Sequence, residues 1–273
     1  MSVENIENLV EFPPFVIPAE HYRGSEPRAL AILLPAMGTT AGFYGPFAAA
    51  LADLGFDVLL PELPGTGKSR PRPSWSVDYG YRELAGRYLK DIAARARTLA
   101  DGKPVMVIGH SLGAHTAALG AAMDAVDIDA LVTVAGGNIH YRNWRGMGSI
   151  KVYTAAQLFR ALTYLFGHLP GQFVGFGGPQ ARTLLRQWSK IIRSGRFDHI
   201  ADGLHAPRLP ALCIGFPGDE FAPAASVEGL ADWLQAETAM LQRDWPGNPH
   251  SSWARHPGAT VACIDGWFRR QGF

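Results

Sequence analysis

The sequence predicts an α/β protein with a doubly wound, mostly parallel sheet and an inserted helical cap. Short runs that are apolar on both faces are typical of parallel strands covered on both sides. These runs lie at residues 29–34, 58–60, 105–108, 131–135 and 211–215. Helix-like stretches accompany them at residues 44–54, 79–99, 112–125 and 227–236. Because strand alternates with helix, we expect right-handed crossovers and a ligand site beyond the carboxyl ends of the strands.

One region interrupts this alternation. Residues 138–206 are rich in aromatic residues, arginine and glycine, with helix-like stretches at 155–166 and 180–194 and no strand-like run of the core type. A crossover needs only about a dozen residues, and this segment is far longer. We therefore predict a core at 1–137 and 207–273 with a helical cap at 138–206; two ordinary crossover helices are the alternative.

The composition excludes several classes of protein. The chain has 273 residues, 47% of them hydrophobic, and its 25 basic and 24 acidic residues leave a formal charge of +1. That balance predicts no electrostatic footprint for nucleic acid or an anionic membrane surface. The two cysteines, Cys213 and Cys263, cannot form a disulfide framework or a four-thiolate zinc site.

The start of the chain shows no targeting signal. It is acidic and lacks an apolar run, so we expect no secretory signal, and apolar runs such as 29–34 are far too short to span a membrane. We expect a cytoplasmic protein without metal or organic cofactor, and a homodimer stays open.

The motif that carries chemistry lies at residues 109–113. Gly109-His110-Ser111-Leu112-Gly113 follows a predicted buried strand and opens a helix rich in small residues. A serine at such a sharp turn must adopt a strained conformation, and side chains at the flanking positions would collide with the neighbouring backbone. This context makes Ser111 a candidate nucleophile.

In this context the sequence resembles the α/β-hydrolase family, from about residue 28 to the C-terminus. The family order is nucleophile, acid and then histidine, with the acid after a late strand. A strand predicted at 209–216 precedes Asp219, and Pro223 follows four residues later, which is the usual family spacing and favours Asp219 over Glu220. The resemblance implies Asp219 as the acid; a turn residue or helix cap is the structural alternative.

The same resemblance points to His250 as the general base. Pro257 follows it by seven residues, and the aromatic pair Trp267-Phe268 closes the last predicted helix, as family members often show. The residue before the histidine is Pro249 instead of the usual glycine. His256 is the competing candidate.

Two backbone N–H groups are the expected oxyanion donors. One is the N–H of Leu112, at the start of a predicted helix, where the helix dipole also favours negative charge. The other is the N–H of Met37, in a loop where Pro35-Ala36 replaces the common His-Gly. This loop resembles that of a subset of predicted bacterial hydrolases with Pro-Ala-Met-Gly; a tight turn without a catalytic role is the alternative.

Residues 63–69 imitate the end of a phosphate-binding loop. The first glycine of that motif would fall at Glu62, and Pro71 and Pro73 stand where its helix should begin. Residues 63–69 therefore do not match a phosphate-binding loop. No metal-binding motif such as His-Glu-x-x-His is present.

We therefore expect a serine hydrolase that cleaves carboxylic esters of a small-molecule acyl substrate through a Ser-His-Asp triad. A thioesterase or acyltransferase with the same triad, or a non-catalytic binding protein of this fold, are the alternatives. Aromatic cap residues are expected either to hold an apolar acyl or aromatic group or simply to pack the cap; they are Trp144, Tyr164, Phe166 and Trp188.

Overall fold

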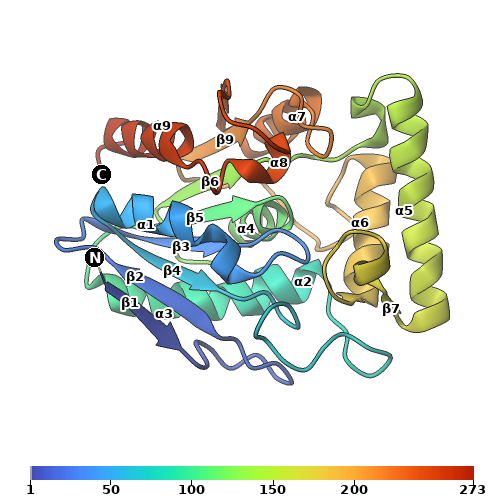
Figure 1. The fold of residues 1–273 in the computed structure, drawn as a ribbon, viewed down its shortest axis with the longest axis horizontal. Helices are drawn as coiled ribbons and strands as arrows, with labels where there is room; N and C mark the ends of the chain where they lie inside the picture. Colours follow the sequence, from blue (N-terminus) through green and yellow to red (C-terminus); the bar gives the residue numbers. More distant parts are fainter. Residues whose placement is uncertain (1) are drawn as a thin grey trace.

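An eight-stranded, mostly parallel sheet forms the centre of the structure (Figure 1), a computed structural model that describes residues 2–273. Its strands are β1 (Ser2–Ile6), β2 (Ala19–Arg23), β3 (Ala29–Leu34), β4 (Phe56–Pro61), β5 (Val105–His110), β6 (Ala130–Val134), β9 (Ala211–Gly215) and β10 (Glu237–Met240). Their order in space is β1-β2-β4-β3-β5-β6-β9-β10. Only the pairings of β2 with β1 and β4 are antiparallel. The predicted fold class is confirmed.

The central strands are buried on both faces, as their apolar runs predict. In β3, Leu30, Ile32 and Leu34 pack into the hydrophobic core on one face. Ala29 and Leu33 pack into a second core on the other face. Each core is closed by its own layer of helices, so the sheet needs no polar face.

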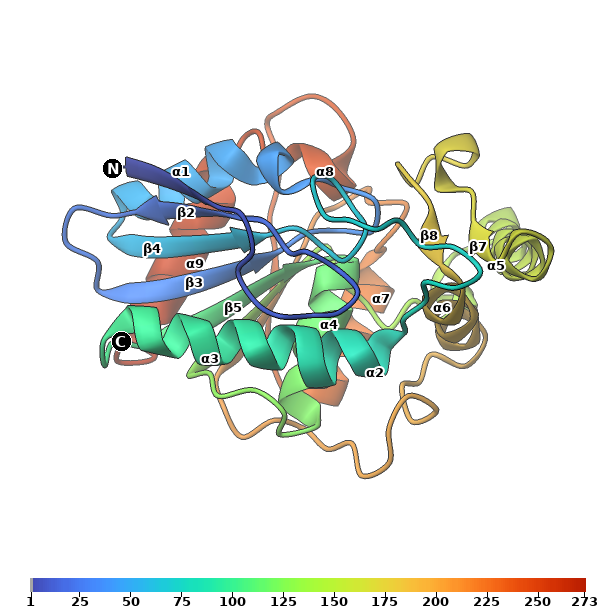
Figure 2. The same cartoon turned by 90° about the horizontal axis from the view of Figure 1, so that it is seen from below.

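Helices cover the two faces in separate layers. One face carries α1 (Gly45–Asp53), preceded by the 3₁₀ turn η1 (Ala41–Tyr44), and α9 (Gly258–Arg270), preceded by the short α8 (Pro249–Ser252). The other carries α3 (Leu89–Ala100), α4 (Leu112–Ala122) and α7 (Ala224–Leu234) (Figure 2). A short α2 (Tyr81–Glu83) and a π-helical segment η2 (Leu84–Tyr88) lead directly into α3.

The segment between β6 and β9 lies beyond the carboxyl ends of the parallel strands (Figure 1). It contains η3 (Tyr141–Asn143), α5 (Met147–Phe166), β7 (His168–Leu169), η4 (Gly171–Phe173), β8 (Gln180–Ala181) and α6 (Arg182–Ser194). Among residues 2–273 it supplies no strand to the main sheet, and β7 and β8 pair only with each other. We call residues 138–206 the cap segment below. Its first helix begins eight residues before the predicted start at 155, because packing on α6 outweighs the low helix propensity of the first turns.

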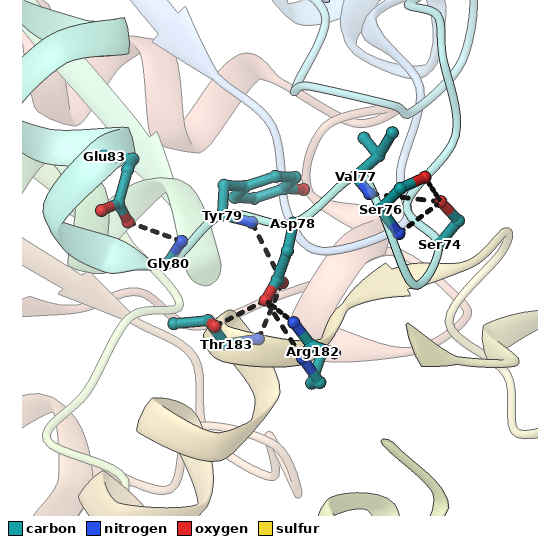
Figure 3. A network of polar contacts seen from close by, with 9 residues as sticks. All are labelled: Ser74, Ser76, Val77, Asp78, Tyr79, Gly80, Glu83, Arg182 and Thr183. Atoms are coloured by element: carbon teal, nitrogen blue, oxygen red, sulfur yellow. Dashed lines mark hydrogen bonds and ion pairs between the residues drawn. The ribbon is translucent and has the colours of Figure 1, made fainter. Parts of the chain in front are cut away.

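A carboxylate on the core anchors the start of α6 (Figure 3). Asp78 accepts hydrogen bonds from the Thr183 N–H (2.9 Å) and the Thr183 hydroxyl (2.7 Å), and it forms an ion pair with Arg182 (3.1 Å). Nearby, the Tyr81 N–H donates to Gln187 Oε1 (2.7 Å). Asp78 thus accepts from one of the N–H groups that a helix start leaves without partners, and it ties the cap segment to the core.

Within residues 2–273, no helix combines the length and the apolar character that crossing a bilayer requires.

Candidate active site

Ser111 occupies the sharp turn between β5 and α4. Its backbone has φ 52° and ψ −107°, a conformation that a residue with a side chain rarely adopts. The flanking glycines make the turn possible: a Cβ on Gly109 would collide with the Gly113 backbone, and one on Gly113 with the Leu34 backbone. The turn therefore aims the Ser111 hydroxyl away from the sheet, beyond the strand ends.

Asp219 and His250 form a hydrogen-bonded pair beside this turn. Buried Asp219 follows β9, and its Oδ2 accepts from His250 Nδ1 at 2.9 Å. Its other oxygen, Oδ1, accepts from the N–H groups of Phe221 (2.8 Å) and Ala222 (3.0 Å). Because the Asp219 carboxylate accepts a hydrogen bond from Nδ1–H of His250, the lone pair of Nε2 stays available to accept a proton.

Ser111 and His250 line one cavity of about 220 Å³. Its apolar walls include Leu112, Ile139 and Trp188. In the described part of the chain, no hydrogen bond joins the Ser111 hydroxyl to His250; such bonds often tighten only when substrate binds.

At this cavity, the N–H groups of Met37 and Leu112 have no acceptor within residues 2–273. The Met37 loop packs closely against the cap segment. A Cβ on Gly38 (φ 71°) would collide with the backbone of Phe176. Pre-positioned, unpaired N–H groups are what an oxyanion needs.

A buried hydrogen-bonded pair beside the cavity, Tyr44 and His110, was not predicted. The Ala36 N–H donates to the Tyr44 hydroxyl (2.9 Å), and the same hydroxyl is hydrogen-bonded to His110 Nδ1 (2.7 Å). The His110 ring lies 4.9 Å from the His250 ring, between centroids. Burial, together with the neighbouring His250, lowers the pKa of His110 well below its usual value, so His110 is neutral. Tyr44 thus links the loop of Met37 to the surroundings of His250.

We expect Tyr44→Phe to lower kcat by about 10- to 100-fold, because the Met37 N–H and the His250 ring lose a shared support. KM should change little, since Tyr44 does not line the cavity. The control is Tyr22→Phe, which also removes one buried tyrosine hydroxyl, bonded there to Glu20. Steady-state kinetics on both variants test this, and equal kcat values for the two would contradict it.

His115 lies at the cavity, one helical turn after Ser111. Its Nε2–H donates to the Gly137 carbonyl (2.6 Å), and the Tyr81 hydroxyl donates to its Nδ1 (2.9 Å). Burial lowers the pKa of His115 to about 4. The imidazole is therefore neutral, and both of its nitrogens are occupied.

This burial makes stability depend on pH. The unfolded chain, with an ordinary histidine pKa near 6.5, binds the proton more tightly than the folded protein. The contribution of His115 to the free energy of unfolding is therefore fully present above pH 6.5. It is lost as pH falls toward 4, by about 3 kcal/mol in total. Urea unfolding across this range should show the loss, and His115→Gln should flatten the curve. A slope that His115→Gln leaves unchanged would contradict this explanation.

The structure separates the aromatic cap residues that the sequence grouped together. Trp188 lines the cavity. The other three do not: Trp144 donates from its Nε1 to the Glu220 carbonyl (2.6 Å), and Tyr164 and Phe166 are exposed near the end of α5. Of the four residues, Trp188 therefore stays the candidate for a substrate contact at this cavity.

The competing base, His256, lies elsewhere. It is exposed and stacks on Trp245, with ring centroids 6.3 Å apart. Of the two histidines, only His250 contacts Asp219.

The loop at 62–69 has a structural explanation. The Glu62 carboxylate accepts from the N–H groups of Ala41 and Lys68, each at 3.0 Å. The loop thus surrounds a protein carboxylate, which would repel a phosphate. In the described part of the chain, no group of three or more His, Cys, Asp or Glu side chains is arranged to hold a metal ion.

Comparison with known proteins gives the family. Residues 32–209 match the family model of the alpha/beta hydrolase fold. No curated protein matches the chain.

Solved structures share the fold at low sequence identity. A hydrolase from Pseudomonas aeruginosa PA01 is 17% identical, covers 97% of this chain and 98% of its own, and has a TM-score of 0.62. A carboxylesterase from Nitrososphaera gargenis is 15% identical, with 95% and 97% covered and a TM-score of 0.63. The thioesterase domain from the curacin biosynthetic pathway is 17% identical, with 97% and 99% covered and a TM-score of 0.58. The chain belongs to the α/β-hydrolase family.

Proposed function

We propose that this chain is a serine hydrolase that cleaves carboxylic esters through an acyl-enzyme. The observation that carries the proposal is the Asp219–His250 hydrogen bond, which leaves His250 Nε2 free at the cavity that Ser111 also lines. A serine hydroxyl is a weak nucleophile at neutral pH and needs such a base.

In the proposed reaction, Ser111 Oγ attacks the ester carbonyl carbon while His250 Nε2 takes the hydroxyl proton. The carbonyl oxygen becomes an oxyanion and accepts from the N–H groups of Met37 and Leu112, each worth about 3–4 kcal/mol of barrier. The imidazolium of His250 then protonates the departing alcohol. Asp219 keeps the ring oriented and stabilises its positive charge. Water, activated by the same imidazole, hydrolyses the acyl-enzyme and restores Ser111.

The cavity favours a compact, apolar acyl group. Its volume of about 220 Å³ is smaller than the roughly 300 Å³ at which drug-sized pockets begin. Trp188, Phe176 and Ile139 supply apolar surface. Since both nitrogens of His115 are occupied, this histidine offers no free donor to a polar acyl chain.

A panel of p-nitrophenyl esters of increasing acyl length, run beside matched thioesters and amides, tests the proposal. We expect the highest kcat/KM on short-chain esters. Faster thioester cleavage, or transfer of the acyl group to an added amine or alcohol instead of water, would replace ester hydrolysis by thioesterase or acyltransferase activity. Folded protein with no turnover of any substrate would favour a non-catalytic binding role.

A further inference from the structure

Helix α5 exposes an apolar stripe on its solvent side. The stripe consists of Met147, Ile150, Leu158 and Leu165, with exposed fractions of 65%, 55%, 56% and 67%. Ile150, Leu158 and Leu165 follow Met147 by 3, 11 and 18 residues. Because an α-helix has 3.6 residues per turn, these spacings place all four side chains on one face. We call these four residues the outer stripe.

The core does not need the outer stripe. A different face of α5 packs inward, through Val152, Phe159 and Leu162, with Ala156 fully buried. Helix α6 lies between α5 and the sheet, and α5 is the outermost helix of the molecule at this end (Figures 1 and 2). The outer stripe is therefore apolar surface that the fold leaves uncovered.

The sequence segment that contains the outer stripe carries charge of one sign. Residues 130–197 contain nine basic residues and no acidic residue, which leaves 16 basic and 24 acidic residues in the rest of the chain. The total charge of +1, from which we expected no affinity for anionic surfaces, hides this asymmetry. Only two of the nine, Arg182 and Arg196, pair with an acidic side chain among residues 2–273. The unpaired ones include Arg142, Arg145 and Lys151, on and just before α5.

We propose that the outer stripe and its basic neighbours dock the protein on an anionic lipid surface. A helix with an apolar face and only basic charges is typical of segments that lie in the plane of a membrane interface. The basic side chains complement anionic headgroups. A second copy of the chain fits less well, since two α5 helices would bring together only like charges. This docking does not depend on the proposed ester hydrolysis, because the outer stripe does not line the catalytic cavity.

Co-sedimentation with vesicles tests the docking. The full chain should bind vesicles of phosphatidylcholine mixed with phosphatidylglycerol, bind phosphatidylcholine alone poorly, and dissociate at high salt. Equal binding to both vesicle types, or binding to neither, would overturn the proposal.

Matched variants locate the contact. Leu158→Asp and Leu165→Asp should each weaken binding about tenfold or more, and they should fold because both side chains are exposed. Leu54→Asp, at an exposed leucine after α1, should bind as the wild type does. Lys151→Glu should weaken binding, whereas Lys90→Glu, on the exposed side of α3, should not. Equal losses in the α5 variants and their controls would overturn the proposal.

Two further measurements separate the remaining explanations. Ser111→Ala protein should bind vesicles like the wild type; weaker binding would mean that lipid enters the catalytic cavity and would overturn docking through α5. Light scattering should show the same mass for wild type and Leu165→Asp. A wild-type dimer that Leu165→Asp dissociates would assign the outer stripe to a second copy instead.

Discussion

Replacing Ser111 by alanine is expected to lower ester turnover about 10⁴- to 10⁶-fold, because the proposed acyl-enzyme forms on the Ser111 hydroxyl. The protein should still fold, because alanine has the same Cβ as serine and adds no strain at φ 52°. Steady-state kinetics on the preferred ester, with circular dichroism as a check of folding, measure the effect.

Ser251 provides the matched control for this variant. Ser251 also lines the cavity, but it follows His250 on α8 and lacks the positive φ of Ser111. Ser251→Ala should retain activity within about tenfold of the wild type. If Ser251→Ala lost as much activity as Ser111→Ala, or if Ser111→Ala stayed active, the nucleophile would be misassigned.

His250→Ala is expected to reduce kcat by about 10⁴-fold or more, because Ser111 would then have no group to accept its proton. The same substitution at His256 should leave kcat nearly unchanged, since that ring stacks on Trp245 away from the cavity. Comparing kcat for the two variants on one ester checks this. A large loss in His256→Ala with activity kept in His250→Ala would reverse the assignment.

The central fold could be predicted from the sequence because its strands are buried on both faces and so read as apolar runs. The edge strands carry no such signal. Strand β1 has four exposed residues out of five, and β10 is only partly buried. Strand β1 forms by pairing with β2, and β10 by pairing with β9. Neither strand propensity nor hydrophobic periodicity predicts which strand will be the partner.

The site was predictable where its chemistry is local or its spacing resembles a family pattern. The glycines around Ser111 reveal a turn that only small neighbours allow. The Tyr44–His110 hydrogen bond joins residues 66 positions apart, and no sequence spacing predicts such a contact. The exposure of Tyr164 and Phe166 depends on which side of α5 meets α6, and the composition of the cap segment does not specify that side.

Labelling with a fluorophosphonate probe, followed by mass spectrometry of the modified peptide, identifies the nucleophilic residue. We expect one covalent adduct on Ser111, which is absent in Ser111→Ala and forms much more slowly in His250→Ala. Folded wild-type protein that takes up no probe, or takes it up at another residue, would contradict it.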